Sequence, residues 1–418
     1  MTIDTEVLVC GGGLAGIGAA VAAARAGAKV LLVERSEILG GLGAGGGVGG
    51  FAAARGGHVG QGRVFADILA GLRAYGALGE EHGWPVRPNP EWGCENWLFD
   101  HQVLPLVLQE ICLDAGVRLR FATTAVGVDR DGDAIDRVRL HGRSLGESVA
   151  ARVVVDATGD GIVARLAGAE VLPDDPGFPG VIQPSFMIFL RRVDTPRPQP
   201  VPSARLYADR ATPDYSVWRE EHGRVGLKLK LFDTPFDTGD AEGYNACTMA
   251  MRTRIPEVVR HFQETQDAHY VFDYASPLLG IREGRRITGD HVLTIDELRA
   301  GARFPDAVAY GTFTVDANRT REILPPYQIP YGSLVATGLE NCFVPGRCFS
   351  ADRMALSSAR VMPTCCLMGN AVGLAAAEAV GTGRPVRSVD TAVVREALAR
   401  DDPEADHLRE HLPADTLP

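Results

Sequence analysis

The chain has 418 residues, 45% of them hydrophobic, and a formal net charge of −11. This length predicts about two globular domains, and the acidic balance argues against a nucleic-acid-binding protein, whose binding surface is basic. The longest apolar stretch, residues 14–24, is about half of what a bilayer requires, and the acidic start is unlike a signal peptide, so we expect a cytoplasmic protein without a membrane span.

A glycine-rich turn follows the first apolar run of the chain. Residues 7–9 are typical of a buried parallel strand, and an Ala-rich helix is predicted over residues 17–25. Between them, Gly11, Gly13 and Gly16 have the spacing G-x-G-x-x-G. The first glycine permits a tight turn, the second lets a pyrophosphate approach the backbone, and the third lets the helix pack closely on the strand, while the helix N-terminus attracts negative charge.

A second strand, predicted over residues 29–33, ends in an acidic residue. Glu34 lies about 20 residues past the fingerprint, where a carboxylate accepts the ribose hydroxyls of a dinucleotide. Strand, fingerprint, helix, strand and acid in this order predict a Rossmann-like α/β domain. The glycine-rich stretch 40–50 follows directly, and this position favours a backbone that lies against a flat ligand over a flexible linker.

The following stretch alternates predicted helices and strands. Helices are expected at residues 64–78, 100–115 and 162–167, and strands at residues 117–121, 125–129, 138–140 and 149–155. Asp131-Gly132-Asp133 is predicted to be a hairpin turn. After the last of these strands come Ala157, Thr158 and Gly159, which form a second glycine turn at the sheet.

The pattern of apolar residues changes near residue 179. Alternating runs at residues 186–190 and 225–232 predict antiparallel strands, and residues 254–266 predict a helix. We therefore expect a separate α+β domain that is inserted into the first domain and faces the substrate.

After this insertion the chain is predicted to return to the first sheet. A short strand ends in Gly346 and Arg347, and a long helix of small residues is expected over residues 363–380. The predicted organisation is a dinucleotide-binding domain of residues 1–178 and 326–385, a substrate or cap domain of residues 179–325, and a C-terminal tail of residues 386–418.

Three features favour FAD over NAD. The chain returns to the sheet twice, at Gly159 and at Gly346, whereas a simple NAD domain is continuous in sequence. The segment 40–50 suits an extended cofactor. The N-terminus of the helix at residues 363–380 could face the O2/N1 edge of the flavin, where the helix dipole stabilises negative charge.

With these features, the chain resembles the FAD-dependent oxidoreductases related to the fumarate reductase and succinate dehydrogenase flavoproteins, whose FAD-binding fold is of the glutathione reductase type. Two segments carry the closest resemblance, Arg282-Glu283-Gly284-Arg285-Arg286-Ile287 and Arg360-Val361-Met362-Pro363-Thr364-Cys365. The resemblance covers residues 5–180 and 275–380. It is much weaker between them, where substrate choice is expected to lie.

The resemblance implies contacts along the whole cofactor, from the pyrophosphate and ribose near the N-terminus, through adenine at the Val126 backbone, to the flavin ring at the last helix. The implied cofactor-binding residues are Gly11, Gly13, Leu14, Ala15, Gly16, Glu34, Arg35, Gly40, Gly41, Leu42, Val126, Ala157, Thr158, Gly159, Gly346, Arg347, Gly369, Asn370 and Ala371.

The attachment of FAD and the substrate are expected to differ from those of succinate dehydrogenase flavoproteins. Those proteins attach FAD through a histidine in the loop after the ribose acid, whereas that loop is glycine here and the nearest histidine is His58. We therefore expect non-covalent FAD. The arginine–histidine dicarboxylate clamp is not evident, and a second G-x-G-x-x-G and a C-x4-C redox pair are missing, so oxygen, a carrier protein or a second small molecule is the expected electron partner.

Four residues are candidates for substrate binding or proton transfer: Arg282, Arg286, Tyr331 and Arg360. Arginine stays protonated and is a poor base, but it binds carboxylates and stabilises oxyanions. For Arg286 a structural ion pair is an equal alternative, and Tyr331 either donates a proton, orients the substrate or simply packs. The cysteines and histidines lack the spacing of a metal site, so no metal is expected.

The leading hypothesis is an FAD-dependent dehydrogenase, oxidase or reductase that transfers a hydride between flavin N5 and a small organic substrate. A flavin monooxygenase that uses oxygen and external NAD(P)H is one alternative, and an FAD-carrying electron-transfer subunit of a complex is another. The Ala- and Arg-rich composition indicates a GC-rich bacterial source, and a homodimer is the default oligomeric state.

Overall fold

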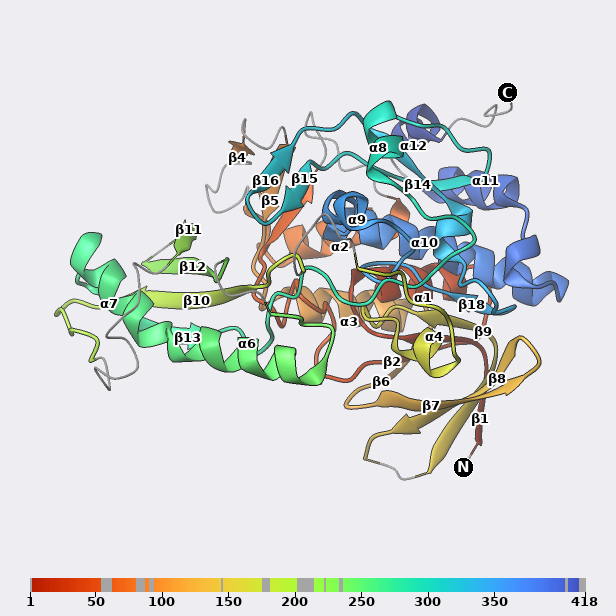
Figure 1. Ribbon diagram of the computed structural model, residues 1–418, viewed down its shortest axis with the longest axis horizontal. Helices are drawn as coiled ribbons and strands as arrows, with labels where there is room; N and C mark the ends of the chain where they lie inside the picture. Colours follow the sequence, from red (N-terminus) through yellow and green to blue (C-terminus); the bar gives the residue numbers. More distant parts are fainter. Residues whose placement is uncertain are drawn as a thin grey trace. The chain divides into compact units, whose positions relative to one another are not determined.

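The computed structural model describes residues 2–53, 62–79, 87–89, 94–143, 146–174, 181–200, 214–221, 223–232, 236–402 and 405–412. The chain divides into two compact units, whose elements are labelled in Figure 1. The larger unit consists of Met1–Ala44, Gly49–Asp175 and Gly284–Pro418, and the smaller unit consists of Gly45–Val48 and Pro176–Glu283.

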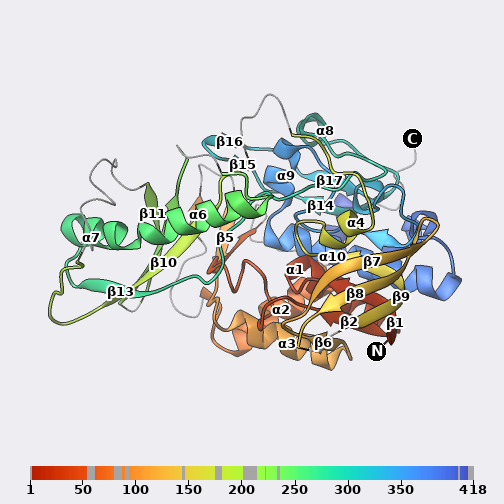
Figure 2. The same cartoon turned by 60° about the horizontal axis from the view of Figure 1, so that its bottom comes forward.

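The larger unit is built on a sheet with a parallel centre (Figure 2). β1 (Thr2–Cys10) pairs in parallel with β2 (Val30–Val33) on one side and with β9 (Glu147–Asp156) on the other. β6 (Arg118–Arg120) extends the sheet beside β2, and β18 (Cys342–Phe343) extends it beside β9, both in parallel. All four residues of β2 are buried, as the continuous apolar sequence of a parallel strand covered on both faces requires.

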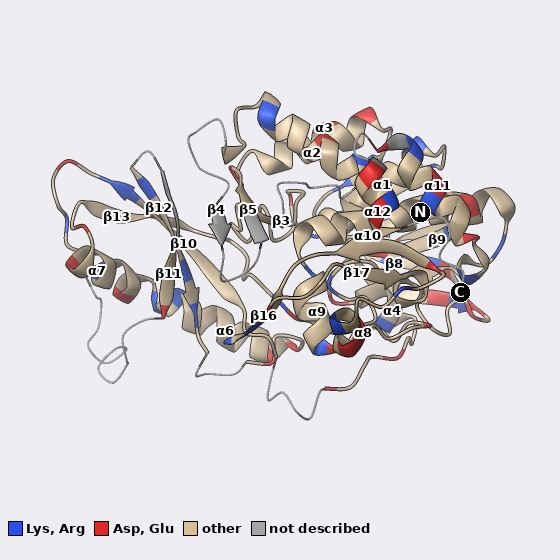
Figure 3. Cartoon of the chain, turned by 90° about the horizontal axis from the view of Figure 1, so that it is seen from above, with Lys and Arg blue, Asp and Glu red and all other residues tan. Residues whose placement is uncertain are grey.

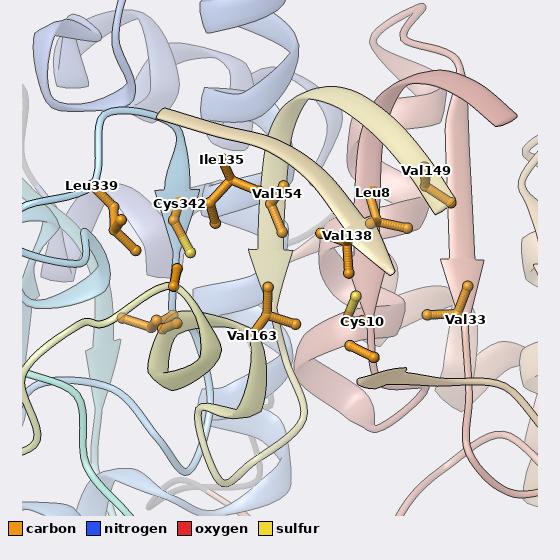
Figure 4. Packing of buried hydrophobic residues seen from close by; sticks show 14 of the residues in the cluster. Leu8, Cys10, Val33, Ile135, Val138, Val149, Val154, Val163, Leu339 and Cys342 are labelled. Carbon is orange, nitrogen blue, oxygen red and sulfur yellow. The ribbon is translucent and has the colours of Figure 1, made fainter. Parts of the chain in front are cut away.

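A hairpin completes this sheet. β7 (Thr124–Asp131) and β8 (Ala134–His141) are antiparallel, and β8 pairs with the first half of β9. The predicted strands and turn of this region are confirmed. Figure 4 shows the sulfurs of Cys10 and Cys342 among the apolar side chains that pack on the sheet. Buried cysteines with free thiols are Cys10, Cys112, Cys247, Cys342, Cys348, Cys365 and Cys366.

The predicted helices of the first half are also confirmed, with small shifts at their ends. They are α1 (Leu14–Arg25), α2 (Arg63–Ala74), α3 (Leu104–Asp114) and α4 (Ile162–Leu166). α3 begins four residues later than predicted, with Pro105 in its first turn, because proline favours that position and is excluded from helix interiors. β3 (Gly50–Ala53), β4 (Arg87–Asn89) and β5 (Cys94–Leu98) form a small antiparallel sheet in the order β3-β5-β4.

The longest helix, α10 (Met362–Thr382), packs directly against α1. A Cβ atom at Gly369 would lie 2.0 Å from the Ala15 carbonyl oxygen, and one at Gly373 would lie 2.3 Å from that of Ala19. The two helices therefore touch backbone to backbone, which only glycine permits. α10 is long and apolar enough to cross a membrane, but 78% of its apolar window is buried inside the protein.

The stretch from residue 284 onward lies in the larger unit, whereas the predicted boundary stands at residue 325. Ile287 donates a backbone hydrogen bond to Cys348 (2.9 Å), and Leu293 donates one to Ser350 (3.1 Å). The elements of this stretch and its continuation are α8 (Ile295–Ala300), β14 (Ala307–Gly311), β15 (Val315–Ala317), β16 (Thr320–Glu322), β17 (Tyr327–Pro330), the 3-10 helix η2 (Tyr331–Leu334) and α9 (Arg353–Ala359). β14 pairs with β17, and β15 pairs with β16.

The C-terminal stretch, expected to be a tail, folds onto the larger unit. It contains the 3-10 helix η3 (Val386–Ser388), α11 (Thr391–Asp401) and α12 (Ala405–His411). Gln328 of β17 donates a hydrogen bond to the His411 carbonyl (2.7 Å), and Leu398, Leu408 and Leu412 are buried. The 7 residues of α12 are too few to show a helical periodicity in the sequence.

The smaller unit is an antiparallel sheet with two helices. The sheet order is β11 (Tyr215–Glu221), β12 (Arg224–Lys230), β10 (Ser185–Arg192) and β13 (Tyr270–Ala275), and the helices are α6 (Ala241–Thr253) and α7 (Ile255–Thr265). Phe186, Ile188 and Leu190 of β10 pack with residues of the helices in one core. Figure 3 marks Lys and Arg in blue, among them those of β10 and β12. The predicted strands and the α7 helix are confirmed.

Candidate functional site

The turn after β1 leaves one open position among close contacts. Gly11 has a φ of +108°, and a Cβ there would lie 2.4 Å from the Ala157 carbonyl oxygen. A Cβ at Gly16 would lie 1.8 Å from the Gly11 carbonyl oxygen. A Cβ at Gly13, which caps α1, would meet no protein atom within 4 Å. The space at this helix N-terminus is therefore available to an anion, as the fingerprint predicts.

Glu34 lies against the fingerprint itself. Its Oε2 accepts a hydrogen bond from Gly12 N (2.6 Å), and its Oε1 accepts hydrogen bonds from Ser36 N and Ser36 Oγ (2.8 Å each). The neighbouring Arg35 is exposed. These three hydrogen bonds fix the carboxylate, and a carboxylate offers about four lone-pair sites, so it retains capacity to accept a ligand hydroxyl.

The predicted adenine contact, Val126, lies in β7, and the residue just before that strand contacts Glu34. Thr123 N donates to the Glu34 carbonyl oxygen (2.9 Å). Val126 lies three residues further on, within an irregularity of the β7–β8 pairing between Ala125 and Gly127, and is 53% exposed. The Val126 side chain is therefore open to solvent, at a position where the strand pairing is interrupted.

The glycine-rich stretch returns to the fingerprint. Gly40 N donates to the Gly12 carbonyl oxygen (2.8 Å), and a Cβ at Gly41 would lie 3.1 Å from Gly13 Cα. Leu42 follows and is half-buried. This stretch therefore brings further bare backbone to the N-terminus of α1.

The second glycine turn lies beside the first. Asp156 at the end of β9 is fully buried and accepts hydrogen bonds from Thr158 Oγ1 (2.6 Å) and Ala164 N (2.9 Å). Burial raises the pKa of Asp156. Ala157 N donates to the Cys10 carbonyl oxygen (2.9 Å), and Gly159 has a φ of +79°. Asp156 thereby holds Ala157, Thr158 and Gly159 in one rigid turn at the carboxyl end of β9.

The third glycine turn brings a cation to the same place. Gly346 has a φ of +86°, and a Cβ there would lie 2.9 Å from Ala15 Cβ. Arg347 Nη1 lies 3.0 Å from Asp160 Oδ1 and its side chain is 15% exposed. A Cβ at Gly159 would lie 2.7 Å from Arg347 Nη2. The turns after β1, β9 and β18 thus converge on the N-terminus of α1.

The residues implied to contact the flavin ring lie deeper in α10 than expected. The helix begins at Met362 with Val361 as its cap, so Gly369, Asn370 and Ala371 are two turns from its N-terminus. Asn370 and Ala371 are buried, and Gly369 packs on Ala15 of α1. The close packing of α10 on α1 is reason enough for a glycine at position 369, without a cofactor contact. The positive end of the α10 dipole lies at Val361 and Met362, two turns before Gly369.

Two of the four catalytic candidates make structural contacts. The buried Arg286 donates hydrogen bonds to the carbonyl oxygens of Ala351 (3.0 Å) and Pro173 (2.9 Å). The Tyr331 hydroxyl donates to the Val386 carbonyl oxygen, and burial raises the pKa of Tyr331. A tyrosine that is bonded in this way to η3 has the contacts of a packing residue, which was one of its predicted alternatives.

The other two candidates belong to different units. Arg282 is buried in the smaller unit. Arg360 lies in the larger unit between α9 and α10, where its Nη2 is 3.2 Å from Asp316 Oδ2. Within the larger unit, Arg286, Tyr331 and Arg360 each contact different partners. Among the residues that the structure describes, no group of three or more His, Cys, Asp or Glu side chains is arranged to hold a metal ion.

Sequence reasoning missed Asp160 and Asp316, the acids that hold Arg347 and Arg360. Asp160 lies in the predicted second glycine turn, so its position at a strand end was a usable signal. Asp316 had none, because its pairing depends on a short hairpin and on a helix far along the chain.

Comparison with known proteins agrees with this geometry. The family model of FAD dependent oxidoreductases matches residues 6–398. The geranylgeranyl bacteriochlorophyll reductase-like protein of Thermoplasma acidophilum has a similar structure, with a TM-score of 0.51 and 12% identity over 98% of this chain and 99% of that chain. CabE, an aromatic hydroxylase from angucycline biosynthesis, has a TM-score of 0.50 and 15% identity over 98% of this chain and 68% of that chain. At these identities the likeness shows a shared fold.

Proposed function

Because the chain belongs to the family of FAD dependent oxidoreductases, we propose that it is an enzyme that oxidises or reduces a small organic substrate by hydride transfer, with its FAD held non-covalently. One observation carries the proposal, namely that the glycine turns after β1, β9 and β18 meet at the N-terminus of α1. Ligands of such sheets lie outside the carboxyl ends of the strands. Within the family, segments 282–287 and 360–365 support a place near the fumarate reductase flavoproteins.

The residues of the site fit FAD. The space over Gly13 and the positive end of α1 suit a pyrophosphate. Glu34 is fixed with spare acceptor capacity for ribose hydroxyls, and Arg347 supplies a cation beside Gly159. When bound, FAD supplies the capacity to accept or release a hydride. The chain supplies orientation, charge and bare backbone.

The smaller unit is proposed to face the substrate. On the side of its sheet opposite α6 and α7, β10 carries Met187 and Phe189, which are 1% and 3% exposed. The Phe189 ring stacks on Tyr274 with centroids 4.5 Å apart. A Cβ at Gly47 would lie 3.0 Å from this ring, so part of the glycine-rich stretch rests there. Met187 and Phe189 are therefore already covered, and this face of the sheet anchors residues 45–48 of the glycine-rich stretch that the proposal places along the cofactor.

Anaerobic reduction of the purified, FAD-loaded chain tests the reaction type. We expect an organic reductant from a panel of alcohols, amines and saturated acids to bleach the visible flavin band. We expect NADH and NADPH to bleach the band slowly, with no acceleration by aromatic compounds. In the direction of substrate oxidation the substrate itself supplies the hydride, so the flavin needs no nicotinamide to become reduced.

Two outcomes would replace this proposal. Fast bleaching by NAD(P)H that an aromatic compound accelerates, with an atom of labelled oxygen gas found in the product, would make the chain a monooxygenase. No bleaching by any compound, together with copurification of an iron–sulfur protein, would make it an electron-transfer subunit.

A further inference from the structure

A buried carboxylate lies between two arginines in the larger unit. Asp316 of β15 is 5% exposed. Its Oδ1 is 2.8 Å from Arg321 Nη2, and its Oδ2 is 3.2 Å from Arg360 Nη2. Arg360 Nη2 also donates to the Asp316 carbonyl oxygen (3.1 Å), and Asp316 N donates to Ser357 Oγ of α9 (3.3 Å). A buried carboxylate is costly unless it is paired in this way, so the three side chains form one fixed cluster.

The cluster places a cation at the start of α10. Arg360 directly precedes Val361, the cap of that helix, and its carbonyl oxygen accepts a hydrogen bond from Cys365 Sγ (3.1 Å). Burial raises the pKa of Cys365 to about 12, and the cations of Arg360 and Arg347 oppose this rise. The first turn of α10 therefore lies within the field of both guanidinium groups, in addition to its own dipole.

The packing of α10 on α1 shows what this positive end faces. Gly369 lies against Ala15 and Gly373 against Ala19, so the two helices run in the same direction. Met362 is two turns before Gly369, and α10 thus extends about 10 Å beyond the N-terminus of α1. If the pyrophosphate lies at the N-terminus of α1 and the adenosine lies toward Glu34, then the flavin half of an extended FAD lies along the first two turns of α10.

We propose that Asp316 is a positioning residue that holds the Arg360 guanidinium at the flavin end of α10, where this cation stabilises the negative charge that reduction places on the flavin. This inference rests on the proposed placement of FAD. Arg321 and Arg360 share one carboxylate, so they repel each other when that carboxylate is neutralised. Loss of the Asp316 charge therefore moves the Arg360 guanidinium group away from the N-terminus of α10.

The midpoint potential of the bound flavin, measured without substrate, tests this role. We expect Asp316→Asn to bind FAD within about threefold of the parent, yet to have a lower potential, because Arg360 no longer faces the flavin. Arg360→Met is expected to lower the potential at least as much, and adding Asp316→Asn to it should lower the potential no further. A carboxylate that acted only through its own charge would give the opposite sign, because its removal would raise the potential.

The control is an ion pair on the same hairpin. Glu322 of β16 pairs with Arg299 (2.8 Å) and does not contact Arg360, so Glu322→Gln should leave the potential unchanged. An unchanged or raised potential in Asp316→Asn overturns the inference. If that variant does not fold, Arg360→Met, which keeps the Asp316–Arg321 pair, carries the test, and an unchanged potential there overturns it too. Because no substrate is added, this result is independent of whether the hydride-transfer assay succeeds.

Discussion

Replacing Gly13 with aspartate should abolish FAD binding and leave the fold intact. The backbone at Gly13 is extended, with φ −72° and ψ 176°, and a Cβ there meets no protein atom within 4 Å. Aspartate is also a preferred helix cap, so the melting temperature of the FAD-free protein should stay the same or rise slightly. The new side chain occupies the pyrophosphate space and adds like charge, and we expect the dissociation constant for FAD to rise at least about 100-fold, or about 3 kcal/mol.

Fluorescence titration of FAD into Gly13→Asp and the parent measures this effect. Gly13→Asn separates bulk from charge, because it has nearly the same shape without the negative charge. Gly381→Ala is the positional control, since Gly381 is exposed and a Cβ there also meets nothing within 4 Å. Tight FAD binding by folded Gly13→Asp would mean that the pyrophosphate lies elsewhere.

Replacing Gly369 with alanine should destabilise the protein, whether or not FAD is bound. The added Cβ would lie 2.0 Å from the Ala15 carbonyl oxygen, which is backbone and has no rotamer to change. The two helices must separate, and overpacking of this kind costs about 3 kcal/mol. Denaturant unfolding of the FAD-free protein measures the loss.

The matched control lies on the same helix. Gly381→Ala adds the same methyl group in open space, and because alanine is a better helix former it should be stabilising by up to about 1 kcal/mol. Equal stability of Gly369→Ala and the parent without FAD would contradict the helix contact. A loss seen only in FAD affinity would instead restore Gly369 as a flavin contact.

The sequence predicted local structure best at positions where the backbone or the environment accepts few residue types. The G-x-G-x-x-G spacing, the buried parallel strands and the position of Glu34 all predict local structure, because glycine and buried apolar runs fit few alternatives. The structure then added what no local pattern contains, namely that Glu34 hydrogen-bonds Gly12 and that the three glycine turns meet.

Sequence reasoning was weakest where a residue's role depends on distant partners. Gly369 resembles a flavin contact, but its neighbour is another helix. The Tyr331 hydroxyl meets a carbonyl of the stretch taken for a tail. Residues 284–325 carry the same alternating texture as the smaller unit, yet their hydrogen bonds join them to the segment after β18. Asp316 could not be identified before its two arginines were seen together.

The visible absorption spectrum of the purified full chain, taken before and after acid precipitation, tests most directly whether FAD is held non-covalently at the convergence of the glycine turns. We predict flavin bands from about one FAD per chain, and we predict that the FAD moves entirely to the supernatant. Flavin that stays in the pellet would contradict non-covalent binding and would make His58, which lies outside the described residues, the first residue to replace. A colourless protein that also fails to bind added FAD would contradict the site itself.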